Sequence, residues 1–236
     1  MLQLLTVDLL KIKRKFIWFF IFLGPIGVIG LEAVNFTLRY EYLTGIYAAG
    51  LWEGLIDNVR YLAHPTLIIG VTIIISMIAN IEHQTNAWKQ LLALPIDKKK
   101  VFAGKFLVSA VLLFVSCTLL AIGTVFLGIA LKFGFEFPVT KVLQMAYFPF
   151  FATMPIIALQ VWLSISMKNQ ATPLTAGIVG MIVSLSSMGL PDWFPYKWPS
   201  LENNWGNPIY SVMAGMLVGV IVFTIGLLDF SRKDVK

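Results

Sequence analysis

Only a few side chains in this sequence could take part in catalysis or metal binding. The chain contains two histidines, His64 and His83, and one cysteine, Cys117. A zinc site needs several nitrogen or sulfur ligands in one place, and one cysteine can form neither an intramolecular disulfide nor a redox pair. The H-E-x-x-H, G-x-S-x-G and G-x-x-x-x-G-K-[ST] patterns are missing from the sequence. We therefore predict no catalytic residue, no metal site and no cofactor bound by this chain, and we interpret Cys117 as a packing residue.

The elements that must position these side chains are membrane spans. Hydrophobic residues make up 58% of the 236 positions and charged residues 13%, about half the charged share of a typical soluble domain. A helix needs about 20 mostly apolar residues to cross a bilayer, and only helices suit apolar runs this long. We therefore predict an all-α membrane protein that forms one transmembrane domain, residues 1–236, with six transmembrane helices. The six apolar runs are Phe16–Leu31, Tyr61–Ile81, Phe106–Leu131, Val142–Met167, Asn169–Pro191 and Asn203–Leu228.

The positions of the basic residues predict the orientation of these spans. Placing both termini in the cytoplasm puts 13 of the 18 Lys and Arg residues on the cytoplasmic side, as the positive-inside rule requires. Residues 1–15 then form a cytoplasmic amphipathic segment. The net charge of +6 follows from this topology, so we expect no nucleic-acid partner. His64 and His83 fall at opposite membrane faces and cannot share a metal ion, and His64 is interpreted as an ordinary interfacial residue.

The only sizeable cytoplasmic loop, between the second and third spans, contains a helical stripe of apolar residues. Trp88, Leu91, Leu92 and Pro95 occur at positions i, i+3, i+4 and i+7, which places them on one face of a short helix. Pro95 ends that helix, and Asp97 can cap the next one. We predict a short amphipathic helix at the inner membrane surface within residues 82–100. A loop that rests on the membrane, with its aromatic residue in the headgroups, explains the same pattern.

Two segments are predicted on the outer side. Residues 35–60 are interpreted as an outer loop with an interfacial helix. Residues 189–208, between the fifth and sixth spans, combine several prolines with aromatic residues and are consistent with a re-entrant segment, although an ordinary aromatic belt has a similar composition. The candidate outer residues are Trp193, Phe194, Trp198 and Trp205.

The cytoplasmic loop resembles a known family. From Glu82 to Lys105 the chain reads E-x5-W-x2-L-L-x-L-P-I-x-K-x3-F-x-G-K, which is similar to the first intracellular loop of type-2 ABC exporter permeases. The lantibiotic-immunity and bacteriocin self-protection permeases are especially similar. The basic ending Asp229–Val235 also resembles that superfamily. In the family this loop is the coupling helix, which binds a groove of a separate ATPase subunit. The resemblance assigns ATPase coupling to Glu82, Trp88, Leu91, Leu92, Leu94 and Pro95.

The resemblance implies an assembly of several chains in a bacterial plasma membrane. Its expected partners are an ABC ATP-binding subunit, which would hold ATP and magnesium, a second permease chain (the same chain or a sister permease), and membrane lipid. The implied function is ATP-driven export of an amphiphilic substrate, an antimicrobial peptide or lantibiotic, for immunity or resistance. The absence of charge from most spans suits such a cargo better than a small ion.

Three alternatives from other classes stay open at this point. A membrane-embedded scaffold could sequester a ligand without turnover. A secondary transporter is less favoured, because ion-coupled transporters place ionisable residues inside their spans and only Glu32, near the outer end of the first span, comes close. An intramembrane enzyme needs a polar cluster that the sequence does not contain. A neighbouring gene that encodes an ABC ATPase would favour the exporter, and the absence of such a gene would favour the scaffold.

Overall fold

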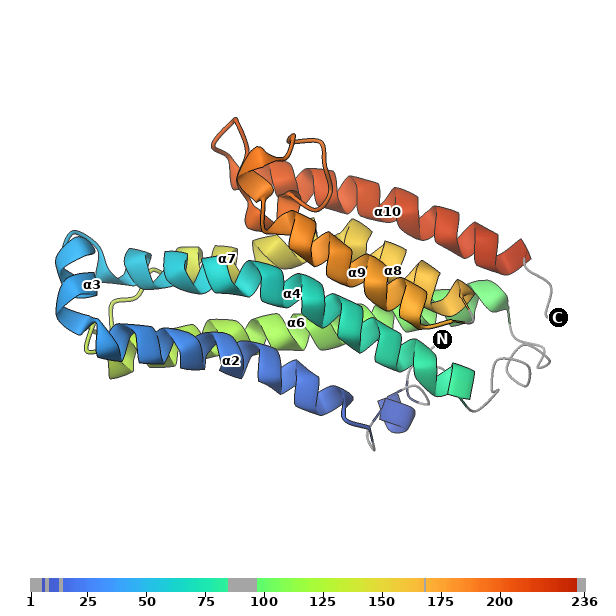
Figure 1. The fold of residues 1–236 in the computed structure, drawn as a ribbon, viewed down its shortest axis with the longest axis horizontal. Helices are drawn as coiled ribbons and strands as arrows, with labels where there is room; N and C mark the ends of the chain where they lie inside the picture. The colour runs from blue at the N-terminus through green and yellow to red at the C-terminus, as the bar shows by residue number, and fades with distance from the viewer. Residues whose placement is uncertain (1–5, 7–8, 13–14, 85–96, 168, 233–236) are drawn as a thin grey trace.

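The computed structural model describes residues 6, 9–12, 15–84, 97–167 and 169–232, and the regular structure in these ranges is entirely helical. Figure 1 shows long helices running roughly side by side, with the start of α2 and the ends of α4 and α10 near one end of the bundle. We call this the terminus end. Residues 190–207 are the cap, and the end of the bundle that carries them is the cap end. The elements are α2 (Ile17–Leu38), α3 (Tyr40–Ile46), α4 (Leu51–Gln84), α6 (Lys98–Ala130), α7 (Val139–Ala152), α8 (Met154–Ser166), α9 (Ala171–Ser184), the short helices η1 (Ser187–Gly189) and η2 (Trp198–Ser200), and α10 (Pro208–Arg232).

Several helices are long and apolar enough to cross a membrane. In the described ranges these are α2, α4, α6 and α10, and the bent pair α7–α8 is a fifth candidate. Helix α9 has 14 residues, or about 21 Å of helix at 1.5 Å per residue, which is shorter than a hydrocarbon core of about 30 Å. The structure therefore confirms an all-helical membrane protein with four to five candidate spans. The sixth span and the orientation of the termini stay predictions.

The helix bounds correct one sequence prediction and confirm another. Helix α2 extends to Leu38 and α4 begins at Leu51, so the prediction of an outer loop over 35–60 is wrong for residues 35–38 and 51–60. An ion pair between Asp57 and Arg60, one turn apart, and a pair between Glu53 and Lys141 satisfy the charges of this first part of α4. At the other end of the bundle the Asp97 side chain accepts a hydrogen bond from the backbone N–H of Lys99 at 2.9 Å, which confirms the predicted cap of α6.

The helix break between α7 and α8 has a local cause. Pro155 stands at the first turn of α8 and has no N–H to donate to the preceding turn, so the helix restarts after Thr153 with a bend of 43°. Helix α10 packs over this break. A Cβ on Gly215 would lie 2.6 Å from the Cα of Ala152, which explains why only glycine allows so close an approach there.

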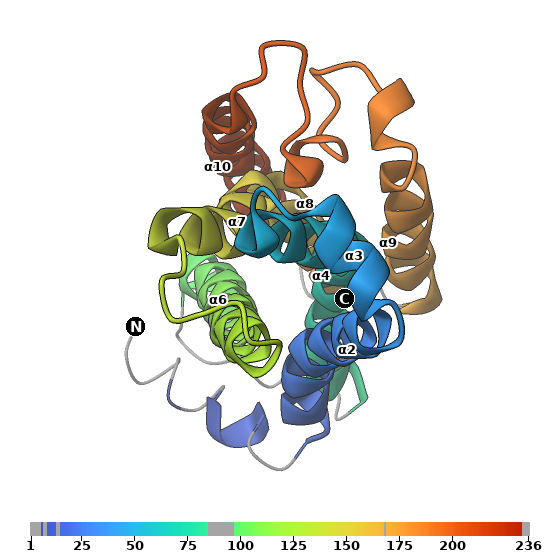
Figure 2. The same cartoon turned by 90° about the vertical axis from the view of Figure 1, so that its left-hand side faces the viewer.

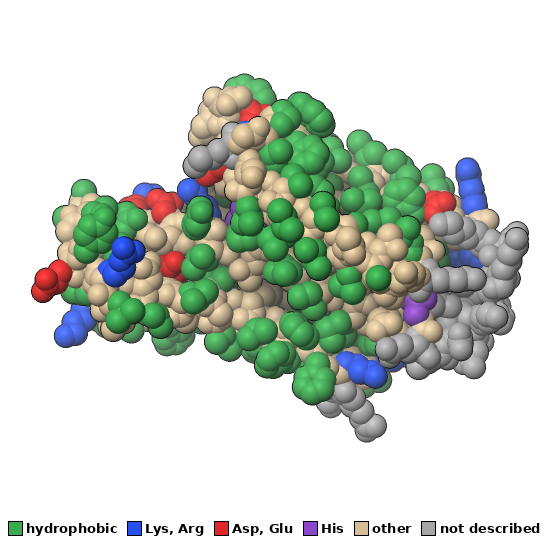
Figure 3. Space-filling model, viewed as in Figure 1, with side chains coloured by type: hydrophobic (Ala, Val, Ile, Leu, Met, Phe, Trp, Pro, Cys, Tyr) green, Lys and Arg blue, Asp and Glu red, His purple; other side chains and the backbone are tan. Residues whose placement is uncertain are grey.

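The interior of the bundle is built around α4. This helix packs against α2, α6, α8 and α9, whereas α10 packs along α8 and α7. The end view in Figure 2 shows α9 and α10 on opposite flanks, with α7 and α8 between them. On the face drawn in Figure 3, apolar side chains cover the middle of the molecule and charged ones gather toward its ends and on the cap. This distribution is typical of a chain embedded in a bilayer.

Candidate functional site

A buried carboxylate at the terminus end holds two lysines. Lys105 Nζ lies 2.8 Å and Lys11 Nζ 2.9 Å from the same oxygen of Glu82, Oε1. The side chains of Glu82 and Lys105 are 0% and 5% exposed, and that of Lys11 is 33% exposed. Removing one partner of a buried ion pair is costly because it leaves a buried charge uncompensated. Glu82 and Lys105 are thus fixed to each other, and Lys11 adds a partly exposed contact.

The cluster joins three segments that are far apart in the sequence. Lys11 belongs to the short helical stretch 9–12, whose Ile12 is 1% exposed and sits in the main apolar core. Glu82 lies in the last turn of α4, and Lys105 lies two turns into α6, where its carbonyl accepts a hydrogen bond from Ser109 Oγ at 2.8 Å. The ion pair of Glu82 with Lys105 therefore joins the last turn of α4 to the beginning of α6.

Two more polar contacts connect the helices at this end. His83 Nε2 is 3.0 Å from the backbone oxygen of Ser164, which links α4 to α8. Trp162 Nε1 donates to the Asp229 carboxylate at 2.8 Å, which links α8 to α10. Polar contacts within an apolar environment resist separation because the freed groups would find no water. These contacts therefore join α4 to α8 and α8 to α10 at this end of the bundle.

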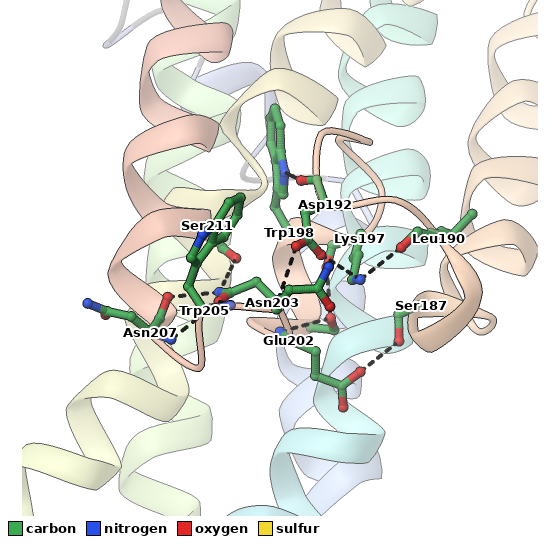
Figure 4. Close-up of polar contacts among 12 residues, drawn as sticks. Ser187, Leu190, Asp192, Lys197, Trp198, Glu202, Asn203, Trp205, Asn207 and Ser211 are labelled. Atoms are coloured by element: carbon green, nitrogen blue, oxygen red, sulfur yellow. Dashed lines mark hydrogen bonds and ion pairs between the residues drawn. The ribbon is translucent and has the colours of Figure 1, made fainter.

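A second polar cluster shapes the cap, drawn in Figure 4. Lys197, buried at 5% exposure, donates to Asp192 Oδ1 at 2.7 Å and to the backbone oxygen of Leu190 at 2.8 Å. The backbone N–H of Asn204 donates to Asp192 Oδ2 at 3.0 Å. The hydrogen bond from Lys197, with that from Asn204, lowers the pKa of the Asp192 carboxyl from its ordinary value. Asp192 is therefore the centre that closes the chain between η1 and α10 into a compact cap.

The histidine, cysteine and carboxylate side chains of the described residues are spread over the molecule. No set of three His, Cys, Asp or Glu side chains in the described ranges could hold a metal ion. His64 and His83 stand 19 residues apart on one continuous helix, or about 28 Å of helical rise, and cannot share a metal ion. Cys117 is buried in the main core.

The comparison with protein families decides which kind of membrane subunit this is. A family model described as "ABC-2 family transporter protein" matches residues 4–184, well over half of the chain. The chain belongs to the ABC-2 transporter family. Comparison with curated proteins and with solved structures gives no match. As an ABC-2 protein it is a multi-pass permease subunit of an ABC transporter, a class of membrane subunit that is generally non-catalytic and generally has an ABC ATP-binding partner.

The structure describes one of the six coupling residues predicted for this ABC-2 subunit. Glu82 lies at the end of α4, and its ion pairs support a fixed exit into the loop. The other five lie outside the described residues, so their coupling role, like the helical stripe that four of them form, stays a prediction: Trp88, Leu91, Leu92, Leu94 and Pro95.

The four predicted cap aromatics do not form one site. Trp198 is 4% exposed, and its indole N–H donates to the Asp192 carbonyl at 2.6 Å. Phe194 is half-buried, with its ring 5.9 Å from that of Tyr196, but Trp193 and Trp205 are 71% and 63% exposed. Helix η2 packs against α4, α7 and α10, so the segment folds back onto the bundle. Its entry into the bilayer stays a prediction.

Sequence reasoning missed the ion-pair partners at both ends of this ABC-2 subunit. The signal for Lys105 was present: a single lysine follows Phe102 and Gly104 inside an apolar helical run, where an isolated charge needs a partner. Lys197 is one of the five basic residues that the predicted topology places on the outer side, and its position in the sequence does not indicate a partner. His64, interpreted as an ordinary interfacial residue, is 8% exposed and lines a cavity at the cap end.

Proposed function

We propose that this ABC-2 subunit is the permease of an exporter that moves an amphiphilic substrate out of the membrane or cell with ATP hydrolysed by a partner. The observation that supports it best is the Glu82 cluster, whose ion pairs join the end of α4 to the beginning of α6 and to the stretch 9–12. A subunit driven from outside needs such a rigid joint at the driven point. Without it, movement of the loop would be lost in local rearrangement.

The mechanism follows from that joint. The partner subunit would hold ATP and magnesium and supply the energy, and closure of the ATPase pair would act on this chain through the loop between α4 and α6. Because Glu82 and Lys105 are held at 2.8 Å, the ends of α4 and α6 move as one unit. The contacts of His83 with α8 and of Trp162 with α10 carry the displacement across the bundle. The terminus end is cytoplasmic in this proposal.

The assembly contains a second permease chain, either another copy of this chain or a sister permease, within a bacterial plasma membrane. The substrate is an antimicrobial peptide of the lantibiotic type, as the resemblance of the Glu82–Lys105 loop implies, and the exporter provides self-immunity or resistance. Support from the residues themselves is the scarcity of charge along the middle of the spans, which favours an apolar or amphiphilic path. Energy must then come from the partner.

Truncation of the predicted stripe tests the coupling. Trp88→Ala removes the largest apolar anchor of the contact, and such anchors supply most of the binding energy at small interfaces. We expect a loss of at least about 1–2 kcal/mol in ATPase association, normal membrane abundance, and loss of resistance to the peptide. Lys89→Ala, off the stripe, is the matched control and is expected to be mild. Equal effects of both substitutions, or none from Trp88→Ala, would contradict the coupling role.

Cysteine labelling in intact cells tests the orientation. After replacement of Cys117, single cysteines within 201–207 are expected to react with a membrane-impermeant reagent, and single cysteines within 98–100 are expected to stay unlabelled. The opposite result would reverse the proposed topology and separate the Glu82 cluster from any cytoplasmic ATPase.

A further inference from the structure

A cavity of about 460 Å³ lies at the cap end between α4 and the chain that follows α9. This volume is within the range of about 300–1,000 Å³ that is typical of small-molecule sites. Its walls carry ionisable side chains from α4 (Asp57, Arg60 and His64), Glu202 from the cap, and several serine hydroxyls. Polar groups that are buried around such a cavity are costly unless they find hydrogen-bond partners.

Two groups in this cavity are incompletely satisfied by the described residues, one in hydrogen bonding and one in charge. His64 is 8% exposed, and its Nε2 has no hydrogen-bond partner there. Glu202 accepts a hydrogen bond from Ser187 Oγ at 3.2 Å, but it is in no ion pair with another described residue. Buried polar groups nearly always have partners. The unpaired imidazole and the half-buried carboxylate therefore point to a ligand that brings hydrogen-bond donors and positive charge.

Arg60 adds a second requirement. Its guanidinium is 3.3 Å from Asp57 Oδ1, and a guanidinium has five N–H donors in a planar fork. One carboxylate contact leaves donors that can bind a phosphate oxygen at the same time. The cavity thus combines a cationic group suited to phosphate with an unpaired carboxylate suited to ammonium. A zwitterionic headgroup carries both complementary charges.

Exposed apolar side chains also line the cavity, and one of them, Leu185, directly follows α9. Leu185 and Tyr61 line the cavity and are 61% and 80% exposed. Ile178, Ile182 and Leu185 are all exposed and follow one another at four- and three-residue spacing, so they form one stripe along the helix. An amphiphile with its head in the cavity would lay its chain along this stripe, in the direction of the membrane interior.

We propose that this cavity binds the headgroup of a phospholipid that bears an ammonium group, with the ammonium at Glu202, the phosphate at Arg60 and an acyl chain along Ile178, Ile182 and Leu185. His64 is satisfied by the same headgroup. The site holds a resident lipid against the cap, where η1 and η2 meet α4. This inference is independent of coupling to an ATPase, because the lipid is bound without nucleotide.

The test is lipid retention by the purified full chain. The chain in detergent is incubated with phosphatidylethanolamine or with phosphatidylglycerol of the same acyl chains, and retained lipid is measured by native mass spectrometry. The anionic lipid offers phosphate but no ammonium, so we expect it to be retained about tenfold less, the loss expected for one charge-assisted contact. Glu202→Gln is expected to abolish this preference. Glu53→Gln, which removes the same charge from the Lys141 pair outside the cavity, is expected to preserve it.

A second variant keeps the test valid if Glu202→Gln disturbs the cap. Ser186 is exposed and lines the cavity, so Ser186→Trp fills the space without removing a described hydrogen bond. Loss of phosphatidylethanolamine from a monodisperse Ser186→Trp protein supports the proposal. Equal retention of both lipids by the unmodified chain would overturn it. Unchanged retention of both lipids by the Ser186→Trp protein would also overturn it. If Ser186→Trp changes only self-association of the chain, the α9 stripe is instead a contact with a second copy of the chain. Preferential binding of a lysine-rich amphipathic peptide over the lipid would assign the cavity to a peptide instead.

Discussion

The replacement of Lys105 by methionine is the sharpest test of the Glu82 cluster. Methionine keeps most of the length of the aliphatic side chain and removes the charge. In the variant, Glu82 keeps its 0% exposure but retains only the contact from Lys11, which is one-third exposed. A carboxylate buried beside a weak counter-charge is strongly destabilising, because the hydration that it loses is not replaced by an ion pair of similar strength.

The expected size follows from the burial of the pair. Breaking a fully buried ion pair costs about 3–5 kcal/mol, whereas a partly exposed pair contributes about 0–1 kcal/mol. Lys105→Met is therefore expected to lower the unfolding temperature of the purified chain by roughly 6–20 °C, given about 2–4 °C per kcal/mol for chains of this size. Lys11→Met, the matched control on the same carboxylate oxygen, is expected to lower it by only a few degrees.

A double substitution separates electrostatics from packing. Replacing both buried partners with neutral side chains is often nearly neutral, so Glu82→Gln in the Lys105→Met background is expected to recover much of the lost stability. The assay is thermal unfolding of the full chain in one detergent, followed by circular dichroism. Equal losses from Lys105→Met and Lys11→Met would refute the reasoning. So would a Glu82→Gln/Lys105→Met variant that is no more stable than Lys105→Met alone.

Three further outcomes are expected. Gly215→Val is expected to prevent the close packing of α10 on the backbone of Ala152, because a Cβ at this position would lie 2.6 Å from the Ala152 Cα, and to reduce the yield of monodisperse protein, whereas a change of less than about 1 °C in unfolding temperature would contradict that packing. Trp52→Ala, at a side chain 6% exposed, is expected to cost about 3–5 kcal/mol in unfolding experiments, and a cost near zero would contradict its burial. Because Lys197 lowers the pKa of Asp192, the charged carboxylate stabilises the cap above its ordinary pKa of 3.8, and this contribution is lost as the pH falls through the lower folded pKa. The protection of residues 190–207 against hydrogen exchange, relative to the unfolded chain, should then fall only at such acid pH, and Asp192→Asn should abolish that pH dependence. A loss of protection near neutral pH would contradict it.

Much of the helical framework could be predicted from the sequence, because its signals are local. Uncharged apolar runs mark α2, α6 and α10, and Asp97 marks the start of α6 through its own side chain. The first part of α4 was missed because Glu53, Asp57 and Arg60 are typical of a loop. Their charges are satisfied by pairing within the helix and with Lys141, which only the folded arrangement provides.

The candidate site could be predicted only in part, because its contacts are not local. Glu82 was selected through a sequence motif, but the convergence of Lys11 and Lys105 on one oxygen joins positions 71 and 23 residues away. The unsatisfied state of His64 depends likewise on the cap, which folds back from more than 120 residues along the chain. Composition indicates which side chains are unusual in a membrane, and tertiary packing decides what they contact.

The central claim is that this ABC-2 subunit transports with energy supplied by a separate ATPase, and purification from the native membrane tests it most directly. The tagged chain is isolated under mild detergent, its associated proteins are identified, and nucleotide binding is measured before and after they are removed. We predict that an ABC ATP-binding subunit co-purifies, that nucleotide binding disappears with it, and that Trp88→Ala reduces its recovery while Lys89→Ala does not. A transport-competent chain that purifies without any ATPase, or that binds ATP by itself, would contradict the account.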